Sequence, residues 1–171
     1  MAAGERPEYL RERVRARISE WQRLGAPARV LRWIARGVRI PFIGGPPPDF
    51  NQGRSLTDAT PEQLEWLEAE VSRLVAKGAW EPTEDRRFVS RCFLVPKRGQ
   101  NKWRLVVDLR YLNRFVRKKS MTMETLKKVR NLAKRGDYMF SFDLEDGFYA
   151  LGVAEKHMPY FTVDIRGQAY R

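Results

Sequence analysis

Apolar residues recur every three or four positions in four stretches of the chain, which is the period of an amphipathic helix. The stretches are residues 8–24, 28–37, 60–78 and 122–135. The third has the clearest start, because Thr60 and Gln63 fit a capping box and Pro61 suits the first helical position. Each stretch ends at or just before a glycine, as helices often do: Gly25, Gly37, Gly78 and Gly136. We therefore predict four helices.

Two strand-like runs predict a β-hairpin. They are FVSRCFLVPK at 88–97 and KWRLVVDL at 102–109, and both are rich in β-branched and aromatic residues. The four residues between them, RGQN, have the length and the glycine of a hairpin connection. We expect the two runs to pair as neighbouring antiparallel strands.

A further segment, YMFSFD, alternates between two kinds of side chain. Tyr138, Phe140 and Phe142 fall on one face, whereas Asp143 falls on the other. This is the period of a half-buried strand. We therefore expect a strand whose last residue, Asp143, points away from the aromatic face.

The final stretch, PYFTVDIRGQAYR at 159–171, predicts another hairpin that stops just after its turn. Residues 38–53 are dense in Pro and Gly and predict an irregular connection. The order of elements indicates an α+β fold. Because a domain seldom leaves an edge strand unpaired and uncovered, we expect this fold to be truncated at the C-terminus.

The positive charge is concentrated in two regions. The net charge of +12 divides into +6 over residues 1–40, −6 over 41–85, +15 over 86–135 and −3 over 136–171. A dense block of cations attracts polyanions and gains from counterion release when it contacts phosphates. Nucleic acid is therefore the expected partner, and the alternative is a solvated surface that only keeps the protein soluble.

The cysteine content and the N-terminal sequence indicate the cellular compartment of the protein. The single cysteine, Cys92, excludes an intramolecular disulfide and is expected to be a small buried hydrophobe. No run of about 18 apolar residues and no secretory h-region occurs. Four glutamates in the first 20 residues argue against an organellar transit peptide. We expect an intracellular protein, cytoplasmic or nuclear, with no membrane partner.

Three cations meet on the predicted hairpin. Lys97 ends the first strand, while Lys102 and Arg104 open the second, so a tight turn brings them together. Lysine binds phosphate as a point charge and arginine as a planar fork of donors. The hairpin is thus a candidate phosphate clamp. The alternative is an ordinary exposed hairpin that carries cations.

Asp143 is the candidate metal ligand. A carboxylate at the exposed end of a strand can hold Mg²⁺, which completes its shell with water and substrate phosphates. One carboxylate is not enough for a two-metal displacement. The alternative role for Asp143 is a cap or a surface residue, and Asp146 is expected to cap the turn DGFY. The single histidine, His157, has no evident partner and is expected on the surface or in the core.

Several motifs in order resemble the N-terminal half of a retroelement reverse transcriptase domain. They are SRCFLVPKRGQNKWRLVVDLRYLN, METL, GDYMFSFDLEDGFYAL and PYFTVDIRGQAY, and they cover roughly residues 30–171 with the upstream WIARGVRIPFIGGPPP. This lead-in is similar to that of LTR-type and DIRS-like retrotransposon polymerases. The resemblance implies a partial right-hand fold, with a fingers β-hairpin, helices and the first palm strand.

The resemblance also implies roles for individual residues. Lys97 and Arg104 match the fingers residues that hold the triphosphate of the incoming deoxynucleotide. Asp143 matches the first metal-binding aspartate of the palm, and Mg²⁺ is expected for the complete domain. Phe148 matches the aromatic residue that packs under the sugar and excludes a 2′-hydroxyl.

Two more positions match the template side of the fingers, Arg110 and Asn113. They follow Asp108 in VVDLRYLN, and the alternative is that they only lock a turn. The implied partners are an RNA or RNA/DNA template-primer, a deoxynucleoside triphosphate and the remainder of the polymerase. The implied segments are a basic helical segment at 1–40, an irregular segment at 41–60, a fingers-like part at 61–136 and an incomplete palm-like part at 137–171.

The motif set is incomplete. No two adjacent aspartates occur, so the Tyr-x-Asp-Asp hairpin that supplies the second metal-binding carboxylate of the family is missing from this sequence. We therefore expect a fragment of an RNA-directed DNA polymerase that is inactive alone. The alternative is a repurposed basic RNA-binding or ribonucleoprotein component without catalysis, which the +6 and +15 regions favour.

Overall fold

The structure is a computed structural model, and it describes residues 10–97, 102–120, 125–144 and 146–171. The helices are α1 (Leu10–Ala16), α2 (Ile18–Arg23), α3 (Ala28–Arg36), α4 (Pro61–Ala76), α5 (Arg110–Asn113) and α6 (Leu126–Leu132), with the 3₁₀ helices η1 (Gly147–Ala150) and η2 (Glu155–Phe161). The strands are β1 (Phe50–Asn51), β2 (Phe88–Ser90), β3 (Cys92–Pro96), β4 (Trp103–Val107), β5 (Thr162–Ile165) and β6 (Gln168–Tyr170). The mixture of helices and strands confirms the predicted α+β class.

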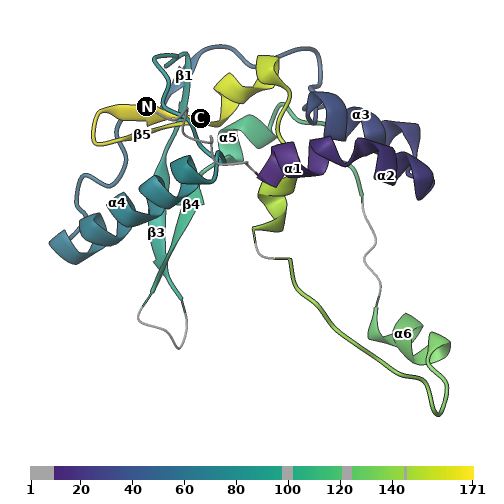
Figure 1. The fold of residues 1–171 in the computed structure, drawn as a ribbon. Coiled ribbons are helices and arrows are strands. Elements are labelled where there is room, and N and C mark those ends of the chain that lie inside the picture. Colours follow the sequence, from purple (N-terminus) through teal and green to yellow (C-terminus); the bar gives the residue numbers. More distant parts are fainter. Residues whose placement is uncertain (1–9, 98–101, 121–124, 145) are drawn as a thin grey trace, which may run out of the picture.

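The strands form two separate sheets. Four pair in the order β1-β2-β5-β6, with β1, β2 and β5 parallel and β6 antiparallel to β5. The predicted hairpin is confirmed, because β3 and β4 pair antiparallel from Cys92 opposite Val107 to Pro96 opposite Trp103. Figure 1 shows this hairpin projecting away from the four-stranded sheet. The first predicted run divides at Arg91, so β2 joins one sheet and β3 the other. The RGQN connection lies outside the described residues.

Helix α4 joins the two sheets. The predicted capping box begins it, because Thr60 N–H donates to Gln63 Oε1 at 2.9 Å and Gln63 N–H donates to Thr60 Oγ1 at 3.3 Å. One buried apolar cluster then holds the helix against both sheets: Leu67 and Val71 of α4, Val163 and Ile165 of β5, and Cys92 of β3. The helix therefore places one set of side chains against the sheet and against the hairpin at once.

The other predicted helices are present with different bounds. The stretch 8–24 divides at Arg17 into α1 and α2, and the stretch 28–37 forms α3. The stretch 122–135 forms only α6, which begins after the Thr125 cap, and residues 121–124 lie outside the described chain. The predicted apolar face of α6 is not buried, since Leu126 is 88% exposed and Val129 is 47% exposed. Figure 1 shows α6 on an arm that extends away from the rest of the fold. None of the described helices has the length and hydropathy needed to cross a membrane.

The predicted strand at 138–143 is wrong. These residues have no regular secondary structure, and Tyr138, Phe140 and Phe142 are 77–102% exposed instead of half-buried. Alternation identifies which face a strand would bury, but a strand also needs a hydrogen-bonded partner. No segment within the described residues pairs with this one. Asp143 therefore lies in an extended exposed segment and not at the end of a strand.

The last predicted hairpin is confirmed as β5 and β6. The expectation that its second strand would be an uncovered edge is wrong, because residues 81–83 pair with it. Glu81 and Arg171 exchange two backbone hydrogen bonds of 2.9 Å, and Thr83 N–H donates to the Ala169 carbonyl at 3.0 Å. The segment that follows α4 thus satisfies the outer edge of β6.

His157 is a core residue, and the core is one of the two environments expected for it. It is 9% exposed, and burial lowers its pKa. The expectation that it has no partner is wrong, because its Nδ1 accepts a hydrogen bond from Ile40 N–H at 2.7 Å. The ring also packs near Phe42 and Tyr160. Cys92 is buried as expected, and burial raises the pKa of its thiol.

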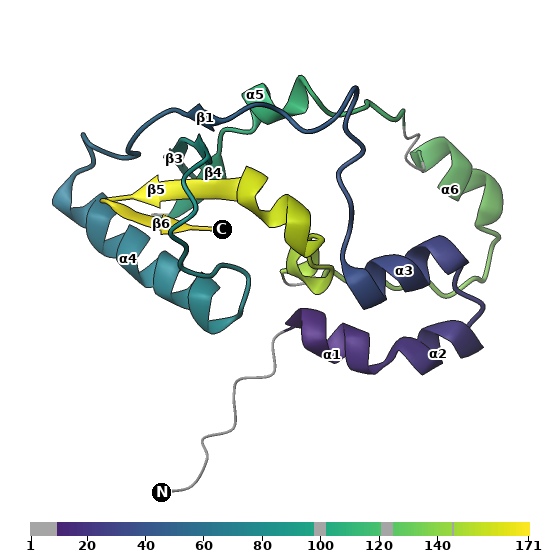
Figure 2. The ribbon, with the colours of Figure 1, turned by 90° about the horizontal axis from the view of Figure 1, so that it is seen from above.

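The N-terminal helices dock on the segment that carries η1 and η2 (Figure 2). Val38 N–H donates to the Gly152 carbonyl at 2.8 Å, and Ala154 N–H donates to the Val38 carbonyl at 2.9 Å. Gly37 allows this approach, because its φ is +76° and a Cβ there would lie 2.6 Å from Ala154 N.

The four-stranded sheet draws strands from three of the four predicted segments, and the proposed division of the chain stays a prediction.

We expect Gly37→Ala to lower the free energy of unfolding by ~3 kcal/mol or more, because backbone strain and a clash with backbone atoms add. Gly25→Ala is the control for a positive φ without a clash, since Gly25 has a φ of +76° and nothing within 4 Å of its would-be Cβ. Strain alone should cost the control ~1 kcal/mol. Urea unfolding of both variants measures the difference, and equal losses would contradict the close docking of Gly37.

Candidate nucleotide-binding cleft

A cleft of about 870 Å³ lies between the β3–β4 hairpin, α4 and η1. Its hairpin wall carries Lys97, Lys102 and Arg104, all exposed. Lys97 N–H donates to the Lys102 carbonyl at 2.8 Å, so the two lysines are directly opposite across the ladder. Arg104 pairs opposite Val95, two residues farther along the strand. Within the described part of the chain, these three cations make no ion pair of their own.

The opposite wall comes from α4 and η1. Helix α4 contributes Trp66, Glu70 and Arg73, and the η1 segment contributes Phe148 and its neighbours. Phe148 is 99% exposed, which leaves its ring accessible from the cleft. The structure thus brings together three of the residues that the sequence proposed separately for nucleotide binding: Lys97, Arg104 and Phe148.

Ion pairs join α4 to the start of η1. Asp146 Oδ2 accepts hydrogen bonds from Arg73 Nη1 at 2.8 Å and from Lys77 Nζ at 2.5 Å. Arg73 also donates two hydrogen bonds of 2.8 Å to the carboxylate of Glu70. The bond from Lys77, followed by that from Arg73, lowers the pKa of Asp146. Asp146 makes no side-chain capping bond to η1, so its expected role as a turn cap is wrong.

The sequence reasoning missed Arg73 and Lys77 and gave Asp146 a different role, that of a turn cap. The only signal was the spacing of Arg73 and Lys77, which are four residues apart and therefore share a face of α4. Nothing in the sequence connects that face with Asp146, because the pairs join positions 69 and 73 residues apart. Only the folded chain identifies the contact.

Asp143 is not among the described residues that line the cleft. Its side chain is exposed and makes no hydrogen bond or ion pair to any other described residue. The described residues also contain no cluster of three His, Cys, Asp or Glu side chains that could hold a metal ion. The role of Asp143 as a metal ligand therefore stays a prediction.

Arg110 and Asn113 lie on α5, away from the cleft. Asp108 accepts two hydrogen bonds from the Arg110 guanidinium, at 2.9 and 2.7 Å, and a third from its backbone N–H at 3.1 Å. The side-chain bond from Arg110 lowers the pKa of Asp108 to about 2. Arg110 thus locks the turn into α5, which is the structural role that the sequence analysis gave as the alternative to template binding. Asn113 is exposed at the end of α5, and the template role of both residues stays untested.

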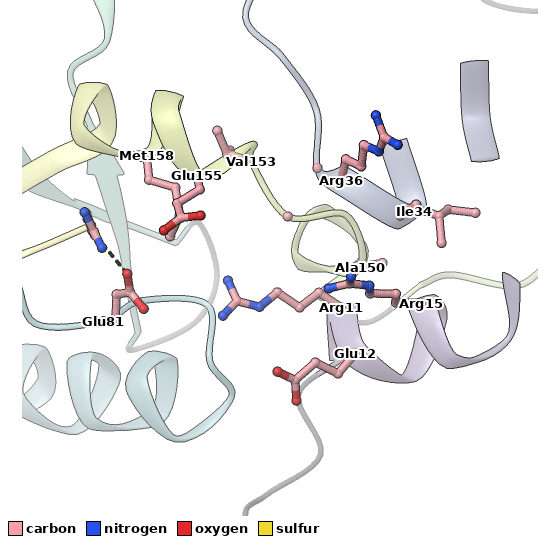
Figure 3. A pocket seen from close by; sticks show the side chains of 14 residues that line it. Arg11, Glu12, Arg15, Ile34, Arg36, Glu81, Ala150, Val153, Glu155 and Met158 are labelled. Atoms are coloured by element: carbon pink, nitrogen blue, oxygen red, sulfur yellow. Dashed lines mark hydrogen bonds and ion pairs between the residues drawn. The ribbon is translucent and has the colours of Figure 1, made fainter. Parts of the chain in front are cut away.

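A second hollow, of about 510 Å³, lies between the N-terminal helices and the η1–η2 segment. Figure 3 shows Arg11 and Arg15 of α1 and Arg36 of α3 around it, with Glu12, Glu81 and Glu155 among them. Glu81 already pairs with Arg171 at 2.8 Å. Because cations and anions alternate around this hollow, its charge selects no class of ligand. The cleft, where the hairpin cations have no acidic partner in the described part of the chain, is the better candidate.

Comparison with known proteins agrees with the motifs. No protein-family model matches the chain. The chain is 25% identical, over 114 residues, to the retrovirus-related Pol polyprotein from transposon 412 of Drosophila melanogaster. That match covers 64% of this chain and 9% of the polyprotein. The chain therefore spans less than a tenth of this relative.

Solved structures show the same fold. A foamy viral protease-reverse transcriptase in complex with dsDNA has a TM-score of 0.58 and 16% identity, and the match covers 79% of this chain and 28% of that one. A mutant of the prototype foamy virus protease-reverse transcriptase has a TM-score of 0.61 and 17% identity, over 94% of this chain and 23% of that one. The predicted resemblance to a fragment of a retroelement reverse transcriptase is confirmed.

We expect Arg110→Gln to raise the pKa of Asp108 from about 2 toward its ordinary 3.8. Because Arg110 depresses this pKa in the folded state, its stabilising effect is present above pH 3.8 and is lost as the pH falls toward 2. Carbon-detected NMR titration of the carboxyl group measures the change. Lys118→Gln, in the exposed segment after α5, is the control. A pKa near 3.8 in the unmodified protein would contradict the locked turn.

Proposed function

We propose that this chain forms the nucleotide-binding part of an RNA-directed DNA polymerase. The observation that carries the proposal is the cleft that brings Lys97, Arg104 and Phe148 together from two elements distant in sequence. The sequence similarity to a retrotransposon Pol polyprotein supports the same class of function. In this proposal, the hairpin belongs to the fingers, and the segment from 137 onward belongs to the palm.

The hairpin binds the triphosphate of the incoming nucleotide. Lys97, Lys102 and Arg104 line one cleft without an ion-pair partner among the described residues, and a triphosphate carries several negative charges in a compact group. The two acids on the opposite wall, Glu70 and Asp146, are already paired with cations of α4. The cleft is therefore positive where a phosphate would enter it.

Phe148 packs against the sugar of the same nucleotide. Its ring is exposed at the cleft wall opposite the hairpin cations, which suits a nucleotide whose phosphates lie at the hairpin. Gly147 precedes it without a side chain, so the backbone can lie close to the ligand. A planar ring at this position would clash with a 2′-hydroxyl and thereby favour deoxynucleotides.

Asp143 supplies one oxygen ligand for Mg²⁺ in the complete polymerase. Its carboxylate is exposed and unpaired among the described residues, which suits an ion that keeps several waters and takes the rest of its ligands from substrate phosphates. The second carboxylate needed for a two-metal reaction has no counterpart in this sequence. We therefore propose that the chain does not polymerise DNA alone and acts together with the remainder of a polymerase.

The template-primer lies against the basic region 86–135. This region has a net charge of +15, and exposed cations on the α6 arm are part of it. The same feature favours a second candidate function, in which the chain is an RNA-binding component without catalysis. The two functions differ in whether Asp143 matters, because phosphate contacts by the arm do not require that carboxylate.

We expect Lys97→Ala and Arg104→Ala each to weaken the binding of a deoxynucleoside triphosphate to the purified chain by ~3–10-fold, the size of one lost charge-assisted hydrogen bond near the surface. Calorimetric titration in low salt gives the dissociation constants. Arg130→Ala on α6 removes the same charge outside the cleft and should change the affinity by less than about twofold. Equal effects of all three variants would indicate non-specific attraction and refute a defined triphosphate site.

We expect Asp143→Asn to abolish primer extension by a polymerase in which this chain is joined to a complementary C-terminal half that carries an Asp-Asp hairpin. The same substitution should leave RNA binding unchanged or slightly stronger, because it removes a negative charge. Extension of a primed RNA template and an RNA titration at several salt concentrations measure the two effects. Absence of extension in the joined protein, with salt-dependent RNA binding in every form, would favour the binding component.

A further inference from the structure

Asp146 stands two residues before Phe148 and connects that ring to helix α4. It is a non-glycine residue with a φ of +53°, so its backbone turns sharply just where η1 begins. Such a conformation persists only where surrounding contacts hold it. Here the contacts are the two hydrogen bonds that Asp146 Oδ2 accepts from Arg73 and Lys77.

The other end of these ion pairs is rigid. Leu67, Val71 and Leu74 of α4 are at most 8% exposed and anchor the helix to the core. Arg73 cannot swing freely, because Glu70 accepts two hydrogen bonds from its guanidinium at 2.8 Å. The carboxylate of Asp146 therefore meets one cation, Arg73, that the helix already holds, and a second, Lys77, at the C-terminal cap of the helix.

The chain on either side of η1 is held differently. After η1, the Gly152 carbonyl accepts a hydrogen bond from Val38 N–H at 2.8 Å and fixes that end to the N-terminal segment. Before it, residues 138–144 are exposed and pair with no strand among the described residues. On this side, and among the described residues, Asp146 makes side-chain contacts that tie the start of η1 to the core helix.

We propose that the ion pairs of Asp146 with Arg73 and Lys77 position Phe148 against the hairpin cations and thereby set the preference of the cleft for deoxyribose over ribose. This inference rests on the proposed function, because it assigns a positioning residue to the same cleft. Asp146 does not touch the sugar; it acts through the place of Phe148. Loss of the ion pairs lets η1 move away from α4, so that the ring no longer opposes a 2′-hydroxyl.

The pairing also removes an electrostatic obstacle. Asp146 and Glu70 line the cleft that receives the triphosphate, and free carboxylates there would repel it. Arg73 and Lys77 compensate these charges. A variant that neutralises one member of the ion pairs therefore changes two things, the position of Phe148 and the local charge, and an experiment has to separate these two effects.

The ratio of the affinities for dATP and ATP separates the effect on the position of Phe148 from the effect on local charge. Titration of the purified chain with dATP and with ATP gives a ratio of dissociation constants in which the shared triphosphate attraction cancels. Asp146→Asn adds a net positive charge and Lys77→Met removes one, so their effects on triphosphate binding should be opposite. If the ion pairs position Phe148, both variants should nevertheless lower the preference for dATP, by about threefold, as expected for partly exposed pairs.

Two controls complete the set. Asp146→Glu keeps the charge and should restore most of the preference. Glu68→Gln removes another ion pair of α4, the one with Arg166 at 2.7 Å, which lies outside the cleft, and should leave the preference unchanged. Tripolyphosphate, which has no sugar, reports whether each variant still folds and binds phosphate.

The outcomes distinguish this inference from the proposed function. A protein that binds neither nucleotide nor tripolyphosphate overturns both. A protein that binds dATP and ATP equally supports triphosphate binding but overturns the role of Phe148 and of Asp146. A preference that survives in both variants, or that rises in one and falls in the other with the net charge, overturns the positioning role alone.

Discussion

The packing of one face of α4 against two sheets is the constraint on which the rest of the structure depends. Leu67 and Leu74 are almost fully buried, and burial of each such side chain contributes ~1.5–3 kcal/mol. Because the same face contacts β5 and the β3–β4 hairpin, the helix determines how the hairpin stands relative to the sheet. A neighbouring face of α4, with Trp66, Glu70 and Arg73, then forms a wall of the cleft.

The distribution of charge around the cleft follows from this arrangement. The chain has separate acidic and basic regions, and α4 lies in the acidic one, with a net charge of −6 over residues 41–85. In the fold, its acid at the cleft, Glu70, is paired with Arg73 of the same helix, whereas the hairpin cations are unpaired among the described residues. The cleft is therefore positive on one side and compensated on the other, which suits a ligand with a charged end and a neutral end.

The exposed aromatic residues at 138–142 show a limit of pattern reasoning. Alternation predicted a strand with an apolar and a polar face, yet the backbone has no partner among the described residues and forms no strand. A β-strand is stable only when its N–H and C=O groups pair with a neighbour, so periodicity alone does not make one. In α6, likewise, Leu126 and Val129 of the predicted apolar face are exposed and not packed into the core.

The sequence by itself determined most of the local elements and the resemblance to a reverse transcriptase fragment. The capping box of α4, the β3–β4 hairpin, the hairpin at 159–171 and the cations at 97 and 104 follow from short-range patterns, because caps, turns and alternation act over a few residues. Tertiary structure decided which of these meet. It brought Phe148 to the hairpin cations, paired residues 81–83 with the last strand, buried His157 against Ile40, and joined Asp146 to Arg73 and Lys77. These contacts depend on how helices and sheets pack, which is a property of the whole chain and is not encoded in any short window of it.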